Sequence, residues 1–185
     1  MLFLGIDQSL RSTGVAVISK EQEVRYTGTV TPGKLTGVSR LVCIRNALRE
    51  VIGLYPGIHY AALEGYSIGS VNRSFDLGEL GGLVRIVLHD EGIPALIVPP
   101  TSLKQFVTGN GSSDKDAMRR AVLKKWGIDI NQDDICDAFG LAQVARSFHL
   151  SDGTTRAELE VLKKLKSSAV RPLSLVAYSA SSLSV

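Results

Sequence analysis

Two carboxylates that could share a metal ion, Asp134 and Asp137, lie three residues apart within residues 133–142. Apolar residues recur there at three- and four-residue spacing, which predicts a helix packed against a core. The two acids then share one helix face, where like charges repel unless a cation neutralises them. The pattern favours a divalent metal ion over acids that simply complement the helix dipole, although the dipole is a sufficient explanation for Asp133.

Two further acids, Asp7 and Glu64, each follow a short apolar run that predicts a buried strand. An unpaired carboxylate at the end of a buried strand is costly, so a functional role is favoured for Asp7 over a turn-capping one. Four convergent carboxylates without cysteine or histidine suit hard cations such as Mg²⁺ or Mn²⁺. Two such ions would activate a water and stabilise the leaving oxygen in a phosphoryl displacement.

An α/β fold would bring these acids together. In it, three antiparallel strands come first and helices then alternate with strands. Helical spacing of apolar residues and Pro-Gly turn signals mark the boundaries. The predicted segments are strands at 2–7, 14–19 and 23–31, a helix at 38–54, a strand at 58–63, a helix at 77–89, a strand at 95–98, a helix beginning near 133 and a short helix at 155–166.

A basic segment at 101–126 contains a loop of small residues, 109–113, between Lys104 and Lys115. Small residues between lysines can approach phosphates, so phosphate contact is favoured for these two lysines. Ser113 or Asp114 could cap the helix that follows. For Arg119, Arg120, Lys124 and Lys125, a solvated helix face explains the charge equally well.

The 185 residues suit one domain, and the net charge of +3 permits a polyanionic partner without requiring one. Cys43 and Cys136 have no metal-binding spacing and predict buried thiols in a reducing compartment. His59, His89 and His149 form no ligand pattern. No leader and no membrane-spanning apolar run is evident, so a cytoplasmic protein is expected.

Taken together, the motifs resemble the RuvC family of Holliday junction resolvases. The similar stretches are Gly-Ile-Asp-Gln-Ser-Leu at 5–10 with Thr-Gly at 13–14, Leu-Glu at 63–64, Asp-Ile-Cys-Asp-Ala at 134–138 and the basic loop at 104–115. The likeness spans about residues 1–150. It implies an RNase H-like nuclease domain there, with a five-stranded mixed sheet flanked by helices, followed by a C-terminal helix and a serine-rich tail in 151–185.

The resemblance also implies an activity: a homodimer that cuts two strands of four-way or other branched DNA symmetrically, leaving 5′-phosphate and 3′-hydroxyl ends. Two Mg²⁺ ions per site are implied, with Mn²⁺ able to substitute. The metal ligands would be Asp7, Glu64, Asp134 and Asp137, and Lys104 and Lys115 would assist catalysis. The helices at 77–89 and 38–54 are the expected dimer contacts.

The family's loop after the strand-end Glu commonly carries an aromatic wedge, and here both Tyr66 and Phe75 are candidates. Arg73 in the same loop is a further expected DNA contact, together with Arg119 and Arg120. Two alternatives remain. Residues 5–7 with 12–14 also resemble the phosphate loop of actin-like and sugar-kinase ATPases, although the chain is short for their paired domains. A non-catalytic junction-binding protein is the other alternative, but it would leave four acids without a purpose.

Overall fold

The computed structural model describes residues 1–65 and 74–167. A five-stranded sheet with the order β3-β2-β1-β4-β5 forms its centre. β1 pairs antiparallel with β2, and β2 with β3, whereas β1–β4 and β4–β5 are parallel. The predicted mixed sheet is confirmed. Its strands are β1 Leu2–Asp7, β2 Thr13–Ser19, β3 Val24–Val30, β4 Ile58–Glu64 and β5 Ala95–Val98.

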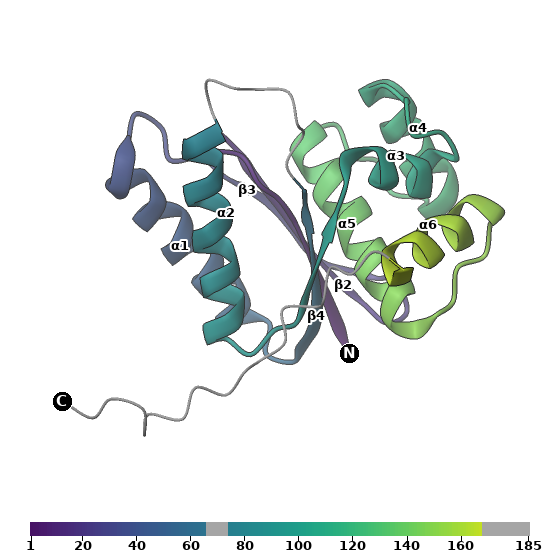
Figure 1. The fold of residues 1–185 in the computed structure, drawn as a ribbon, viewed down its shortest axis with the longest axis horizontal. Coiled ribbons are helices and arrows are strands. Elements are labelled where there is room, and N and C mark those ends of the chain that lie inside the picture. Colours follow the sequence, from purple (N-terminus) through teal and green to yellow (C-terminus); the bar gives the residue numbers. More distant parts are fainter. Residues whose placement is uncertain (66–73, 168–185) are drawn as a thin grey trace.

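Helices cover both faces of the sheet (Figure 1). One face carries α1 (Gly37–Leu54) and α2 (Ser74–Asp90). The other face carries α5 (Asp133–Leu150), with α3 (Pro100–Thr108), α4 (Lys115–Trp126) and α6 (Arg156–Ser167) packed around it. The predicted helix at 77–89 begins earlier, at Ser74, and the basic segment forms two helices, α3 and α4.

Alternation along the central strands builds two separate cores. On β1, Phe3 belongs to the core beneath α5, whereas Leu4 and Ile6 belong to the core beneath α1 and α2. β2 alternates in the same way, with Ala16 facing α5 and Val17 facing α1 and α2. The central strands are therefore buried on both faces, which requires their near-continuous apolar sequences.

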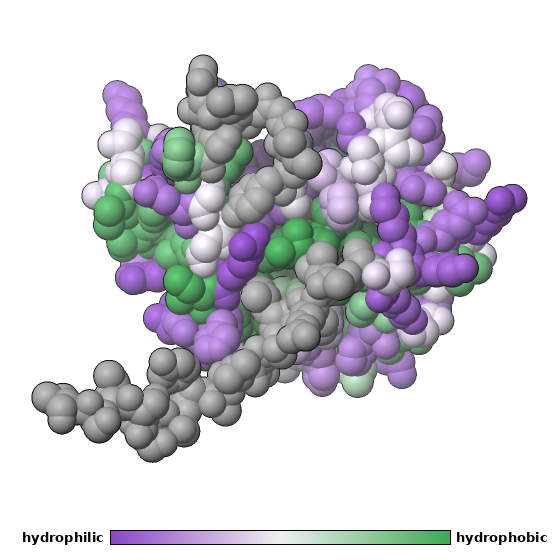
Figure 2. All heavy atoms as spheres, in the orientation of Figure 1, coloured by the Kyte–Doolittle hydropathy of each residue, from purple (hydrophilic) through white to green (hydrophobic). Residues whose placement is uncertain are grey.

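The short helix α6 contributes Val161, Leu162 and Leu165 to the core beneath α5. Polar residues dominate the surface over α3, α4 and α6, while apolar residues gather over the α1–α2 side (Figure 2). Among the described residues, none of the helices is both long and apolar enough to cross a membrane. The serine-rich stretch 168–185 lies outside the described residues.

Candidate active site

Asp7 and Glu64 lie side by side at one edge of the sheet. β1 and β4 are parallel neighbours with Ile6 opposite Leu63, so the two acids that end these strands occupy adjacent positions. The Gln8 side-chain amide donates to the backbone carbonyl of Glu64 at 3.0 Å and ties the two strand ends together. The predicted proximity of the two strand-end acids is confirmed.

The turn after Asp7 is held by its own side chains. The Thr13 hydroxyl donates to the Ser9 carbonyl at 2.6 Å, and the Ser9 hydroxyl accepts from the backbone of Ser12 at 3.3 Å. These bonds return the chain directly into β2, where Gly14 pairs with Asp7. The Asp7 side chain is thereby kept at the sheet edge, only 8% exposed.

Two glycines allow α5 to lie directly on this part of the sheet. A Cβ atom at Gly5 would lie 1.9 Å from the Ala138 carbonyl oxygen, and one at Gly14 would lie 2.0 Å from the Asp134 carbonyl oxygen. Both contacts involve helix backbone, which has no flexible end to move aside. Only glycine therefore permits this approach, which brings Asp134 and Asp137 to the strand-end acids.

The four carboxylates, Asp7, Glu64, Asp134 and Asp137, form what we call the acid cluster. Burial, and then repulsion from Glu64 and Asp137, raises the pKa of Asp7 to about 9. Burial and the charge of Glu64 raise the pKa of Asp137 to about 6, and burial also raises the pKa of Glu64. The cluster therefore disfavours ionisation of these carboxyl groups, because the surrounding protein does not fully neutralise their charge.

The donor set fits a hard divalent cation, because every member supplies carboxylate oxygens. Burial raises the pKa of the neighbouring Cys136 thiol to about 12, so this thiol stays protonated and is a poor ligand. Within residues 1–65 and 74–167, no group of three or more acidic, histidine or cysteine side chains is already arranged to hold an ion. Instead, Asp7 and Glu64 hydrogen-bond to each other.

Lys104 and Lys115 both act on the acid cluster. The charge of Lys104, on α3, lowers the pKa of Glu64 and of Asp137, against the larger effect of burial. The Lys115 ammonium donates to Asp133 at 2.8 Å, and this hydrogen bond raises the pKa of Lys115, with smaller contributions from Asp134 and Asp137. The two lysines that flank the small-residue loop therefore lie on the acid side of the molecule.

The loop between these lysines is closed on itself. The Thr108 hydroxyl accepts from the backbone of Asn110 at 3.0 Å, and the Asn110 side chain accepts from the backbone of Ser112 at 3.0 Å. Asp114, rather than Ser113, caps α4 by accepting from Ala117 at 2.7 Å. Because these loop N–H groups are already used, the lysine side chains are the stronger candidates for phosphate contact.

The remaining predicted DNA contacts are scattered. Arg119 is bound to Asp133 at 2.9 Å and also pairs with Asp116, so it is more than a solvated charge. Arg120 is exposed on α4, and Phe75, in the first turn of α2, is 87% exposed. Tyr66 and Arg73 lie outside the described residues.

Sequence reasoning missed two features of the site. Gly5 and Gly14 were part of the motifs, but their close contact with α5 depends on residues more than 100 positions away. Asp133 was explained by the helix dipole alone, whereas its side chain holds both Lys115 and Arg119. The mixture of acids and bases at 114–119 and 133–137 was the only available signal for the second feature.

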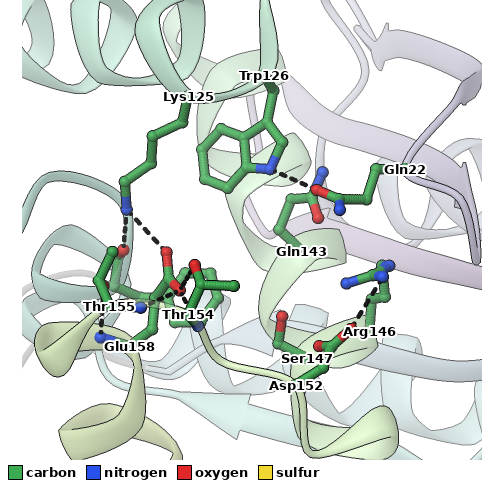
Figure 3. A pocket seen from close by; sticks show the side chains of 11 residues that line it. Gln22, Lys125, Trp126, Gln143, Arg146, Ser147, Asp152, Thr154, Thr155 and Glu158 are labelled. Carbon is green, nitrogen blue, oxygen red and sulfur yellow. Dashed lines mark hydrogen bonds and ion pairs between the residues drawn. The ribbon is translucent and has the colours of Figure 1, made fainter.

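A cavity of about 260 Å³ lies at the opposite end of α5 (Figure 3). The Lys125 ammonium donates to the Phe106 carbonyl at 2.9 Å and to Glu158 at 3.0 Å. Arg146 pairs with Asp152 at 2.9 Å. The four charged residues that line the cavity are paired with one another, so they serve to hold α6 and the preceding loop on the core.

The chain is similar to known proteins in both sequence and fold. The family described as "Crossover junction endodeoxyribonuclease RuvC" matches residues 3–145. The chain is 31% identical over 150 residues to the protein of that name from Chloroflexus aggregans, covering 77% of this chain and 90% of the relative. It is 29% identical over 155 residues to the one from Synechococcus sp. strain CC9311, covering 77% and 96%.

Two solved structures have the same fold. The Thermus thermophilus RuvC structure superposes with a TM-score of 0.70 at 20% identity, covering 82% of this chain and 97% of that one. T. thermophilus RuvC in complex with Holliday junction substrate gives a TM-score of 0.69 at 19% identity, covering 77% and 90%. The RNase H-like fold expected from the motifs is confirmed. The chain belongs to the RuvC family of crossover junction endodeoxyribonucleases.

Proposed function

We propose that this protein is an endonuclease that resolves four-way DNA junctions by paired strand cuts in recombination, repair or phage DNA processing. The observation that carries the proposal is the acid cluster, in which the strand-end acids Asp7 and Glu64 meet Asp137 of α5 and all three have raised pKa values. A buried acid cluster of this kind is costly to a fold and is expected where the charge has a catalytic use. Curated relatives carry the corresponding enzyme name.

RuvC enzymes are metal-dependent nucleases, and we propose Mg²⁺ as the ion, two per site, with Mn²⁺ able to substitute. Asp7, Glu64, Asp134 and Asp137 would hold the ions. When bound, the metal lowers the pKa of a water and stabilises the charge of the leaving oxygen. Because the pKa of Asp7 is raised to about 9, metal binding at this carboxyl would displace a proton, and metal binding and proton release would be linked.

The chain's own residues supply orientation and charge around the reacting phosphate. Lys104 and Lys115 would contact the phosphate that is cut, because both lie close to the acid cluster. The charge of Lys104 lowers the pKa of Glu64, and the charges of Asp134 and Asp137 raise the pKa of Lys115. Hydrolysis there would leave 5′-phosphate and 3′-hydroxyl ends.

Other side chains would bind DNA beyond the cut position. Arg120 is exposed on α4 and would contact backbone phosphates, and Arg119 would do so if it exchanged one carboxylate partner for a phosphate. Phe75 is exposed enough to stack on bases, and Tyr66 and Arg73 are proposed contacts from the sequence alone.

We further propose a cytoplasmic location, as expected from the sequence. We also propose a homodimer, because one acid cluster cuts one strand and a four-way junction needs two symmetric cuts. Exposed apolar side chains on α1 and α2 support this arrangement: Val38 is 75% exposed, Leu54 64% and Ile86 60%. A side chain added at Gly78 or Gly82 of α2 would meet nothing within 4 Å, so that surface is open to a second copy.

The nucleotide-binding alternative is disfavoured by Gly14, which lies against the Asp134 backbone and so serves helix packing at the position where a phosphate loop would need open space. The test of the nuclease proposal uses a synthetic four-way junction and a linear duplex of the same sequence. Cleavage of the junction with Mg²⁺, and none with a chelator, is expected. Tight junction binding without cleavage under either Mg²⁺ or Mn²⁺ would favour the non-catalytic alternative instead.

A further inference from the structure

Asp133, the first residue of α5, binds two cations, one with each carboxylate oxygen. Lys115 Nζ lies 2.8 Å from Oδ2, and Arg119 Nη1 lies 2.9 Å from Oδ1. Both cations come from α4, one turn apart. A single carboxylate therefore joins the start of α4 to the start of α5, immediately before the acid cluster.

This bridge decides where the Lys115 ammonium lies. The Lys115 side chain is 71% exposed and has a flexible four-carbon stem, so without a partner it would sample many positions in solvent. Bound to Asp133, its charge is close enough to Asp134 and Asp137 to feel both carboxylates. Asp133 thus holds a mobile cation beside the acids that would receive a DNA phosphate.

Stability is a poor explanation for the bridge. Ion pairs with a largely exposed partner contribute little to folding, because solvent screens them and the long side chains lose freedom. Complementing the helix dipole explains an acid at the first position of α5, but it does not explain why that acid engages two cations from α4. The arrangement makes better sense as a means of placing the cations.

We propose that Asp133 is a positioning residue that holds Lys115 beside the acid cluster, ready for the phosphate to be cut. The inference rests on the proposed nuclease function. It also carries a distinctive signature, because Asp133 is itself an anion near the path of the DNA. Removing its charge should weaken catalysis through Lys115 while leaving DNA binding unchanged or tighter.

The test compares Asp133→Asn with Asp116→Asn in single-turnover cleavage and junction-binding assays with Mg²⁺. Asp116 is the matched control, because it pairs with Arg119 and has no bond to Lys115 among the described residues. We expect Asp133→Asn to slow cleavage about tenfold without raising Kd, as loss of an outer orienting partner commonly does, and Asp116→Asn to stay within about twofold. Asp133→Glu should recover part of the rate.

A double variant tests whether Asp133 acts through Lys115. If it does, Asp133→Asn combined with Lys115→Ala should cut no more slowly than Lys115→Ala alone. Multiplied effects, or wild-type cleavage by Asp133→Asn, would overturn the proposal. So would an increase in Kd that accounts for the whole loss of activity, because that is the behaviour of a simple DNA-binding residue.

A readout without DNA separates this inference from the nuclease proposal. Relaxation of the ¹⁵N-labelled Lys115 ammonium, assigned with Lys115→Arg, should show greater mobility in Asp133→Asn than in the wild type or in Asp116→Asn. Failure of the wild type to cut junctions would count against the proposed function alone. Unchanged Lys115 mobility in Asp133→Asn would count against the positioning role alone.

Discussion

Buried acids near the two ends of α5 have pKa values shifted in opposite directions. At its N-terminal end, Asp7 is buried and faces other carboxylates, and its pKa rises to about 9. At its C-terminal end, Glu158 is equally buried, at 6% exposure. Burial raises the pKa of Glu158 too, but Lys125 and the backbone N–H groups of Thr154 and Thr155 outweigh it, so the pKa falls below its ordinary value (Figure 3).

The difference shows what burial alone does not reveal. Both sites pay for desolvation, but only one contains its own cation. The Lys125–Glu158 pair is complete and ties α6 to the core. The acid cluster has Lys104 and Lys115 only at its margin, and the proposed function requires a metal cation from solution to neutralise it.

The sharpest way to break this comparison is to remove members of the acid cluster. Asp7→Asn, Glu64→Gln, Asp134→Asn and Asp137→Asn should each reduce junction cleavage by about a thousandfold or more, because each would remove a metal ligand. Junction binding should stay the same or tighten, since repulsion of DNA phosphates falls. Single-turnover cleavage measures the first effect and gel shift the second.

Asp129→Asn is the matched control, because Asp129 is an exposed acid between α4 and α5. It should cut at the wild-type rate. A member of the cluster whose variant also cuts at that rate with Mg²⁺ has been wrongly assigned as a ligand.

Stability should respond in opposite directions at the two ends. Glu158→Gln leaves Lys125 half-buried without its partner and should lower the free energy of unfolding by about 2–4 kcal/mol. Asp7→Asn removes a carboxyl group that the folded protein must keep protonated at pH 8 while the unfolded chain ionises it, so it should raise the free energy of unfolding by about 1 kcal/mol at that pH. Chemical denaturation without metal measures both. Equal destabilisation by the two variants would contradict the difference between the acid cluster and the Lys125–Glu158 pair.

The glycine contacts test whether α5 must lie directly on the sheet. Gly14→Ala places a Cβ against the Asp134 carbonyl and should lower the free energy of unfolding by about 1–3 kcal/mol, and cleavage should fall with it as Asp134 is displaced. Gly53→Ala, in α1, meets nothing within 4 Å and should be neutral or stabilise by about 0.5–1 kcal/mol. Thermal unfolding and cleavage assays on both variants give the answer.

The two half-buried lysines should separate function from stability. Lys104→Met is expected to slow cleavage about tenfold, as loss of one supporting charge commonly does, with little change in the midpoint of unfolding. Lys125→Met should lower that midpoint because Glu158 loses its partner, while the purified folded protein keeps its cleavage rate below the transition. An exchange of these phenotypes would reverse the roles assigned to the two ends.

The smallest expected effects are the pH dependence of stability and, through it, the pH dependence of metal binding. The folded protein keeps a proton on Asp7 up to about pH 9, whereas the unfolded chain releases it near 3.8, so this group lowers the free energy of unfolding progressively as pH rises between those values. Glu158 acts in the opposite sense, and its stabilisation is lost as pH falls below 4.5.

Mg²⁺ should offset the loss of stability that the acid cluster causes as pH rises. The increase in Tm that Mg²⁺ produces should therefore grow from pH 6 to pH 9, the interval marked by the pKa values of Asp137 and Asp7. Differential scanning calorimetry measures the change, which we expect to be a few degrees. A shift that is independent of pH would separate metal binding from these two acids.

The sequence by itself predicted the strands of the described residues and most of their helices, though not α3, and it singled out the four acids of the cluster. β1 and β5 have the predicted bounds, Leu2–Asp7 and Ala95–Val98, and the other strands differ from their predicted bounds by one residue at one end or at both. This worked because apolar periodicity and turn residues are local signals that act within a few positions. Acids at the ends of apolar runs were informative for the same reason, since burial of the run predicts burial of the acid.

Only the tertiary structure decided which charges meet. Arg119 and Lys125 had the same sequence interpretation, yet one bridges to Asp133 and the other reaches Glu158, 33 residues away. The need for glycine at position 14 likewise arises from the backbone of Asp134, 120 residues later. Charge pairing and close packing depend on distances across the fold, and composition or spacing along one segment carries no record of those distances.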